Sequence, residues 1–280
     1  MHTMSDENTD NTSSSQPLTA TAQVAKDLME LAKNDENTIL ASKNFGESAV
    51  IISKTIKNCL LPLAAVNFGI DKAKRYFEER FKIDLEEKIQ SIPAENIVEP
   101  KASIAGPALQ NLAFSHEEPD LKDMYLNLIS SAMNSEKNED THPAFVEIIK
   151  QLTSEEARLL PLFLKNDVPN TIARVVYKQE KSGSQIDGYK HILPLTSGGE
   201  NYYNKHIPSF VDNWLRLGII EVKYDTWVLD DRYDALEMRD EYIEDQLDTG
   251  GEYTKTLGKG IIRRTTFGAQ FAAIVGLTNE

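Results

Sequence analysis

Apolar residues recur at helical spacing through the first third of the chain. One stripe has its members three or four residues apart, which places them on a single helix face: Phe45, Ala49, Ile52, Ile56, Leu60 and Leu63. Pro62 interrupts this stripe, and because proline cannot donate to the preceding turn, we expect a kink or a new helix start there. The next segment is charged and amphipathic, with Phe77 and Phe81 on the side predicted to be buried. Helices are therefore expected from about residue 18 to residue 91.

Three prolines lie just before the next apolar stripes, and each is predicted to start a helix. They are Pro107, which follows Gly106, then Pro119, and then Pro143, which follows His142. The stripe after Pro119 is predicted to bury Leu121, Tyr125, Leu128 and Ala132. Proline suits the first helical turn because its backbone angle is preset and its missing N–H needs no partner there. A turn that cradles a ligand is the alternative at Gly106-Pro107. The repetition of the pattern favours helix starts.

Beyond residue 152 the pattern changes from helical to mixed. Thr153 and Glu156 have the spacing of a capping box, which predicts another helix. Residues 171–179 are β-branched and strand-like, and glycine-rich loops follow them. A helix over 207–217 closed by Gly218 is expected next.

The last third of the chain is predicted to contain two hairpins separated by a polar helix. Two short strands are expected around 224–226, the polar helix over 232–248, and a second hairpin that turns at 258–260. A final helix is expected to be capped by Thr266. Ten apolar side chains of this region are predicted to be core: Trp214, Leu215, Leu217, Ile219, Ile220, Trp227, Tyr233, Leu236, Ile243 and Leu247.

These patterns predict a mainly α protein, with an N-terminal helical body followed by a smaller α+β winged-helix-like C-terminal domain. The name of that domain rests on the order helix, then hairpin, within 207–230. Residues 1–17 are rich in Ser, Thr, Asn and Asp and are expected to form a disordered tail. Residues 18–152 are expected to form the helical domain and residues 153–280 the winged-helix-like domain.

The charge of the chain argues against non-specific binding to phosphate backbones or anionic lipid. The 280 residues carry a formal net charge of -14, with twelve carboxylates and three basic residues between Glu221 and Glu252. Cys59 is the single cysteine, so no internal disulfide is possible and a reducing cytoplasm fits best. No secretory signal is visible, and the longest uncharged span, between Lys57 and Asp71, is too short to cross a bilayer.

No motif for catalysis or cofactor binding is present. Phosphate-binding glycine loops, a nucleophile elbow and paired zinc-binding histidines are all missing, so neither enzymatic activity nor a metal or cofactor is expected. Gly106, Pro107, His142 and Pro143 remain candidate functional turns. His142 has Asp140 and Glu147 nearby in sequence, as a general base would, but a structural role at a helix start is favoured.

Four basic residues near the C-terminus form a candidate contact for an anion or nucleic acid: Lys255, Lys259, Arg263 and Arg264. Two interpretations stay open, because these cations can equally balance the neighbouring acidic segment. In a winged helix that binds DNA, the helix predicted at 207–217 would read the bases and the hairpin after it would be the wing. Both carry few basic and many acidic residues, whereas DNA-binding proteins gain much of their affinity from phosphate contacts. A wing that contacts protein, or has a purely structural role, is therefore favoured over one that reads DNA.

One block of the sequence has a specific resemblance. Residues 96–134, "NIVEPKASIAGPALQNLAFSHEEPDLKDMYLNLISSAMN", are followed by "HPAFVEIIKQLTSEEARLL", "NWLRLGIIEV" and "TTFGAQFAAIV". This arrangement, from about Ala94 to Val275, resembles the abortive infection alpha (Abi-alpha) family of bacterial proteins. The resemblance implies a bacterial, cytoplasmic protein of phage defence, in which infected cells die or stop growing before the phage matures. It brings no catalytic residues.

Three functions are compatible with these observations. The first is a non-enzymatic defence protein that binds another protein, of the host or the phage. The second is a regulator that binds nucleic acid through the wing and the basic cluster, although nucleic acid is not expected as the main partner. The third is an effector whose helices around 45–81 contact a membrane on activation.

Overall fold

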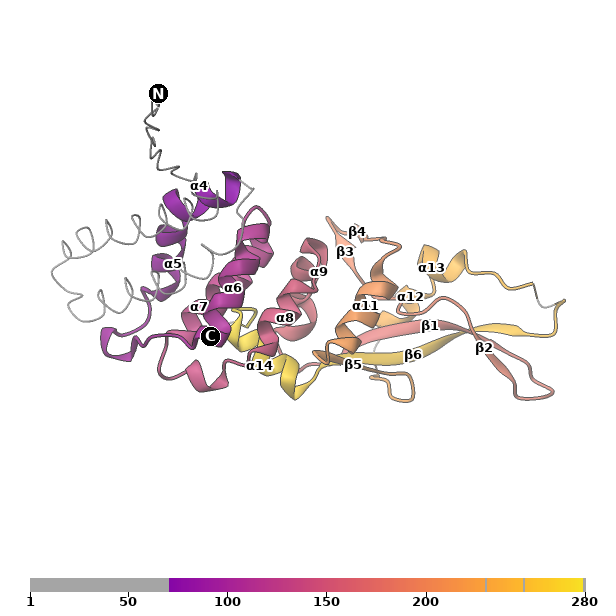
Figure 1. Cartoon of the computed structure of the whole chain (residues 1–280). Helices are drawn as coiled ribbons and strands as arrows, with labels where there is room; N and C mark the ends of the chain where they lie inside the picture. The colour runs from indigo at the N-terminus through magenta and orange to yellow at the C-terminus, as the bar shows by residue number, and fades with distance from the viewer. Residues whose placement is uncertain (1–70, 230, 249, 279–280) are drawn as a thin grey trace, which may run out of the picture.

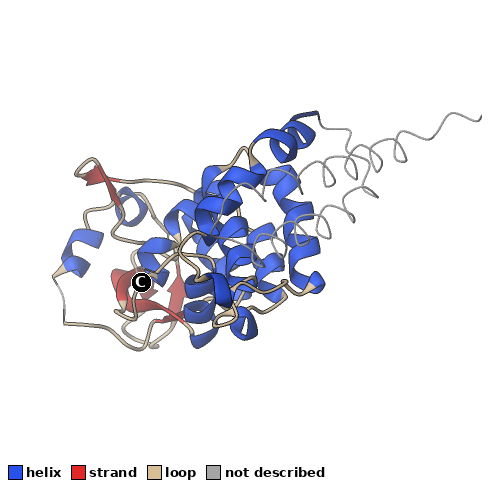
Figure 2. Ribbon diagram, turned by 90° about the vertical axis from the view of Figure 1, so that its left-hand side faces the viewer, coloured by secondary structure: helices blue, strands red, loops and turns tan. Residues whose placement is uncertain are grey.

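A computed structural model describes residues 71–229, 231–248 and 250–278 of the chain (Figure 1). The predicted tail at 1–17 and the apolar stripe between Phe45 and Leu63 lie outside these residues. The described part is a mixed α+β structure. Helices gather on one side of the molecule and the antiparallel sheet on the other (Figure 2).

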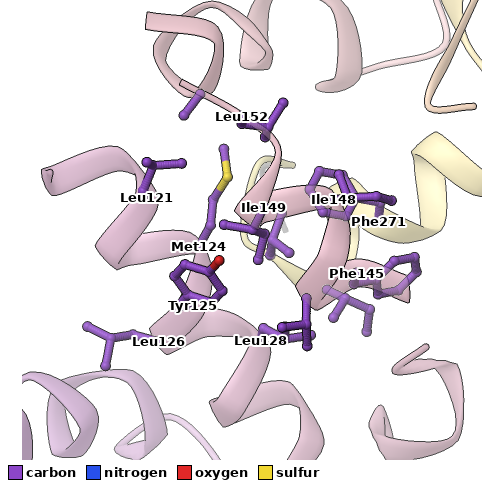
Figure 3. Close-up of a cluster of buried hydrophobic side chains, with 14 of the residues drawn as sticks. Leu121, Met124, Tyr125, Leu126, Leu128, Phe145, Ile148, Ile149, Leu152 and Phe271 are labelled. Atoms are coloured by element: carbon purple, nitrogen blue, oxygen red, sulfur yellow. The ribbon is translucent and has the colours of Figure 1, made fainter. Parts of the chain in front are cut away.

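The helical side is built from consecutive helices that pack around one apolar core. They are α4 (Asp71–Glu79), α5 (Phe81–Ile89), α6 (Ala102–Ser115), α7 (Pro119–Ala132), α8 (Ala144–Lys150), α9 (Ser154–Leu159) and α10 (Pro161–Leu164), with short 3-10 turns at Ala94–Asn96 and Asn138–Asp140. Helix α7 lies at the centre, in contact with α5, α6, α8 and α9. The residues predicted to line its buried face, Leu121, Tyr125, Leu128 and Ala132, are all buried (Figure 3).

Two of the three proline-based helix starts are confirmed, and one is wrong. Pro119 is the first residue of α7, and Pro143 is the N-cap of α8. Helix α6 instead begins at Ala102, so Pro107 lies inside it and leaves the carbonyl of Ser103 without its helical donor. Ser103 is exposed, so water can reach this part of the helix, and Gly106 has no Cβ to clash with the proline ring that follows it.

The predicted capping box is confirmed, and both of its reciprocal hydrogen bonds are present. Thr153 Oγ1 accepts from the Glu156 backbone N–H at 3.2 Å, and Glu156 Oε2 accepts from the Thr153 backbone N–H at 2.8 Å. The last helix, α14 (Thr266–Ile274), is capped by Thr265 rather than by Thr266. Either threonine could supply the hydroxyl, and the backbone of Thr265 is the extended one that a cap needs.

The main sheet has four antiparallel strands in the order β2-β1-β6-β5. Its members are β1 (Asn170–Lys178), β2 (Gln185–Asp187), β5 (Ile220–Lys223) and β6 (Thr254–Arg264), while β3 (Thr196–Ser197) and β4 (Glu200–Asn201) form a separate ribbon. The predicted strand at 171–179 is confirmed as β1. The predicted helix at 207–217 is α11 (Ile207–Arg216), and Gly218 follows it with a φ of 72°.

Neither predicted hairpin forms. The chain leaves the sheet after Lys223, and β6 runs straight through the glycines at 258 and 260 as one continuous strand. These glycines are needed for close packing rather than for turning, because a Cβ at Gly258 would meet Val176 at 2.8 Å and one at Gly260 would meet the Lys223 carbonyl at 2.7 Å. The predicted polar helix is split into two short ones, α12 (Arg232–Leu236) and α13 (Asp240–Ile243).

The sheet separates two cores. Ile172 of β1, Ile220 of β5 and Ile262 of β6 belong to the large core of the helical side, together with α14, which returns from the sheet to α7. Residues on the opposite face form a second, smaller core: Ala173, Val175, Tyr177, Ile192, Tyr233 and Leu236. The large core contains residues from both sides of position 152, and the domain boundary placed there stays a prediction.

Candidate functional site

The segment that joins β5 to β6, residues 224–253, is called the β5–β6 connection. It carries five large apolar side chains that are exposed to solvent: Trp227, Leu229, Met238, Ile243 and Leu247. Trp227 is 59% exposed and Leu229 is 101% exposed, whereas the other six exposed large apolar residues of the described chain lie outside this segment, between positions 83 and 203. Single exposed apolar residues are ordinary, but their concentration in one connection indicates a surface that contacts something.

The sequence predictions fail at this surface and succeed beside it. Tyr233 and Leu236 were predicted to be buried, and they form the second core against β1. Trp227, Ile243 and Leu247 were also predicted to be core, and all three are exposed. Helices α12 and α13 are too short to keep one long helical face in register, so Tyr242 of α13 packs on the second core while its neighbour Ile243 stays exposed.

Carboxylates are interspersed along the chain with the exposed apolar side chains. Seven exposed acidic residues lie between positions 225 and 248: Asp225, Asp231, Asp234, Glu237, Asp240, Glu244 and Asp248. Two basic residues lie in the same interval, of which Arg239 is buried. The surface of the β5–β6 connection is therefore apolar and negatively charged at once.

A buried ion pair holds the middle of the β5–β6 connection in place. Arg239 is 2% exposed, and its guanidinium donates to the Glu241 carboxylate at 2.8 Å. The same guanidinium donates to the carbonyls of Leu195 at 2.9 Å and Tyr202 at 2.6 Å, which directly precede β3 and follow β4 of the small ribbon. One side chain thus satisfies a buried charge and ties two distant loops together.

Tyrosines and backbone groups fix the rest of the segment. The Tyr233 hydroxyl donates to the Gly260 carbonyl at 2.6 Å, and the Tyr177 hydroxyl donates to the Asp245 carbonyl at 2.9 Å. The Tyr189 backbone N–H donates to the Asp245 carboxylate at 2.6 Å. The β5–β6 connection is therefore anchored to the sheet by buried hydrogen bonds, while five of its large apolar side chains stay exposed.

The first residue of the β5–β6 connection, Tyr224, is held by a buried histidine. Its hydroxyl lies 3.0 Å from His191 Nδ1, while His191 Nε2 lies 3.1 Å from the Asp212 carboxylate on α11. His191 has a φ of 61°, the only positive value among the described residues that are not glycine. Burial lowers the pKa of His191, against the opposing effect of Asp212, and burial raises the pKa of Tyr224 to about 12. Sequence patterns gave no signal for this contact.

The predicted basic cluster is engaged within the chain. Lys255 Nζ donates to the carbonyls of Tyr242 and Asp245 at the end of α13, as a cation does at a helix C-terminus. Lys259 lies with its Nζ 5.1 Å from the centre of the Tyr233 ring. These contacts stabilise the base of the β5–β6 connection.

The two arginines of the cluster lie on opposite faces of β6. Arg263 pairs with the Glu221 carboxylate on β5, and this hydrogen bond lowers the pKa of Glu221. Arg264 donates to the Leu164 carbonyl at the end of α10, at 2.9 Å. The structure therefore brings Lys255, Lys259 and Arg263 to one face of the strand and places Arg264 on the other.

The candidate turns lie apart from this surface. Gly106 and Pro107 are in the first half of α6, and His142 and Pro143 precede α8. His142 Nδ1 accepts from the Ala144 backbone N–H at 3.0 Å, and its ring contacts Phe145 and Phe267. This geometry is that of a residue at a helix start.

Two kinds of feature are absent from the part of the chain that the structure describes. No group of three His, Cys, Asp or Glu side chains is arranged there to hold a metal ion. No helix among the same residues has both the length and the apolar character needed to cross a membrane.

Comparison with known families gives one match. The family model described as abortive infection alpha matches residues 73–275, which include both cores and the β5–β6 connection. Comparisons with curated proteins and with solved structures give no match.

Proposed function

Because the chain belongs to the abortive infection alpha family, we propose that it acts in phage defence by binding another protein through the β5–β6 connection, without catalysing a reaction. The proposal places the protein in the bacterial cytoplasm. It also treats α11 and the paired strands β5 and β6 as a winged-helix-like support for a protein contact. Nucleic acid is not the partner in this proposal, since the nearby cations are paired within the chain.

The observation that carries the proposal is the exposure of apolar side chains on a segment that is firmly anchored. Leu229 and Met238 are the most exposed large apolar residues of the described chain. Tyr233 lies between them and Arg239 follows Met238, and both are hydrogen-bonded to distant backbone carbonyls. A surface held in its binding conformation loses little conformational entropy when it associates. Exposed apolar side chains gain free energy when a partner removes them from water.

The charge of the surface defines the partner. Carboxylates such as Asp234 and Glu237 lie in the same segment as Met238, so a partner must neutralise them while covering the apolar side chains. A protein segment that carries Lys or Arg next to apolar residues has this chemistry. Opposite charges raise the rate of association, and salt weakens this effect.

A triple substitution tests the proposal. We expect Trp227→Ser, Leu229→Ser and Met238→Ser together to abolish protection in phage-challenged cells, measured as plaque counts at matched levels of soluble protein. The melting temperature should change little, because surface substitutions usually alter stability by less than about 0.5 kcal/mol each. The matched control is Leu162→Ser, Val168→Ser and Ile186→Ser, which removes three exposed apolar residues elsewhere and should leave protection intact.

The reverse result would remove the surface from the mechanism. If the triple variant of the β5–β6 connection still protects while the control variant does not, the partner binds at another face. If both variants protect like the wild type, exposed apolar residues have no part in the function. Neutralising Asp234, Glu237 and Asp240 to their amides should lower protection without changing the apolar side chains.

A further inference from the structure

A cleft lies on the helical side, away from the β5–β6 connection. It has a volume of about 520 Å³ and opens where the end of α6, the start of α7, the end of α8 and the start of α9 converge. Its floor is apolar and comes from the buried residues Leu121, Ile149 and Leu152, which Figure 3 shows facing the same space. An apolar floor with a few polar groups is typical of sites for small molecules.

The floor contains one polar group without a partner. Tyr125 is 1% exposed and lines the cleft, and its hydroxyl makes no hydrogen bond within the described part of the chain. The hydroxyl end of Tyr125 points toward Ile149 on α8 (Figure 3). The hydroxyl is open to the water of the cleft, so a molecule bound there can replace this water as its hydrogen-bond partner. Burial raises the pKa of Tyr125, so its hydroxyl keeps its proton at neutral pH and can donate.

The rim provides a flat surface and a second polar group. Phe114 on α6 is 58% exposed at the edge of the cleft, where its ring can stack on another ring. The Asn111 side chain donates through Nδ2 to the Pro107 carbonyl at 2.9 Å, which leaves its amide oxygen as an acceptor. A ring that carries both an acceptor and a donor would match Tyr125 and Asn111.

The charges of the rim select against an anion. Glu118 and Glu155 line the cleft with a single lysine, Lys150, which lies 3.8 Å from the Glu147 carboxylate. A phosphate or carboxylate on the bound molecule would lie near two carboxylates.

We propose that this cleft binds an uncharged nitrogen heterocycle of nucleobase or nucleoside size, stacked on Phe114 with its polar edge on Tyr125 and Asn111. This site is separate from the proposed protein-binding surface, and it does not depend on that function. Base stacking on an aromatic side chain and one hydrogen bond give a weak to moderate affinity.

Calorimetric titration of the full chain with adenosine and with uridine tests the proposal. We expect at least one of them to bind with a dissociation constant below about 1 mM. Tyr125→Phe keeps the ring and removes the hydroxyl, and it should weaken binding by about 3- to 10-fold, as the loss of one hydrogen bond does. Phe114→Ala should weaken it by about 5-fold or more. Tyr203→Phe, an exposed tyrosine outside the cleft, is the matched control and should bind like the wild type.

Three outcomes would overturn the assignment. The first is that neither nucleoside binds. The second is that Tyr125→Phe and Phe114→Ala both bind as tightly as the wild type. The third is that adenosine monophosphate binds more tightly than adenosine. Melting curves of each variant establish that the protein is folded before titration. The serine variants of the β5–β6 connection should bind the nucleoside normally, which keeps this test independent of the phage-challenge result.

Discussion

The helical side and the β5–β6 connection differ in which side chains they bury and which they expose. Around α7 the buried side chains are mostly apolar, as with Leu128 at 0% exposure. In the connection two charged side chains, Arg239 and Glu241, are buried, while Trp227 and Leu229 face water. The first arrangement derives its stability from removing apolar surface from water, and the second from ion pairs and hydrogen bonds.

This difference separates stability from binding. A protein that hides its apolar residues in one region can present them in another only if something else fixes the second region. Here the fixing groups are polar and buried, so the apolar side chains are left available for a partner. Substitutions in the helical core should therefore lower the stability of the protein, whereas substitutions of the exposed apolar side chains should affect binding.

The largest effect is expected from the helical core. Phe145 is fully buried, with its ring 5.3 Å from Phe267 and 5.5 Å from Phe271. Phe145→Ala should lower the free energy of unfolding by about 3 to 5 kcal/mol, because it leaves a cavity among aromatic rings. Urea denaturation measures this change. Trp227→Ala is the matched control, and a loss of similar size there would contradict the contrast between the two regions.

Breaking the buried ion pair should cost nearly as much. Arg239→Met leaves the Glu241 carboxylate and the carbonyls of Leu195 and Tyr202 without their donor, which should destabilise the protein by about 3 to 5 kcal/mol. The double variant Arg239→Met with Glu241→Met should recover part of this loss, since no charge then remains buried alone. Stability equal to that of the wild type in the single variant would mean that the pair does not anchor the connection.

A gain in stability is expected at the proline inside α6. Pro107→Ala restores an N–H that can donate to the Ser103 carbonyl and removes the clash of the proline ring. The missing hydrogen bond and the clash together cost about 3 kcal/mol in a helix interior. Part of the gain is offset by about 0.4 to 1 kcal/mol, because the unfolded chain becomes more flexible. Thermal melting should therefore move upward. A lower melting temperature would indicate that Pro107 starts the helix, as the sequence pattern suggests.

The smallest effect is a dependence on pH at His191. Burial lowers the pKa of His191 in the folded state below the ordinary value of about 6.5, which applies to the unfolded state. At pH values between the folded-state and unfolded-state pKa, the unfolded state therefore binds more protons than the folded state. The free energy of unfolding should fall as the pH drops below about 6.5, by at most about 1.4 kcal/mol per pH unit, and recover above it.

His191→Asn is the variant that isolates this contribution. Asparagine tolerates a positive φ, so the backbone conformation is kept while the titrating ring is lost. The slope of stability between pH 5 and pH 7 should become shallower in the variant than in the wild type. Equal slopes would assign the pH dependence to other groups.

Sequence patterns predicted the helical side well and the β5–β6 connection poorly. The stripe of Leu121, Tyr125 and Leu128 and the capping box at Thr153 depend on contacts within a few residues, so spacing alone identifies them. The resemblance to the abortive infection alpha family was also visible in the sequence, and the family match confirms it.

The failures share a physical cause, which is dependence on distant partners. Gly258 and Gly260 look like a turn in the sequence, but they pair with residues of β1 more than eighty positions earlier, and this pairing keeps the strand straight. Trp227 and Ile243 look like core residues, but the burial of Arg239 against Leu195 decides which side of the connection faces inward. His191 and its contact with Tyr224 depend on a backbone conformation that no local pattern predicts.

The return of α14 to the helical side has a consequence for the order of folding during synthesis. Ser131 on α7 donates to the Ile274 carbonyl at 2.9 Å, across 143 residues of chain, and β1 obtains its central neighbour only when β6 has been made. Contacts of such long range slow folding, because the loop between them must close before they form. On the ribosome, α7 therefore emerges long before its last partner and waits with an incomplete apolar surface, which is when a chain of this kind is most exposed to aggregation and most in need of a chaperone.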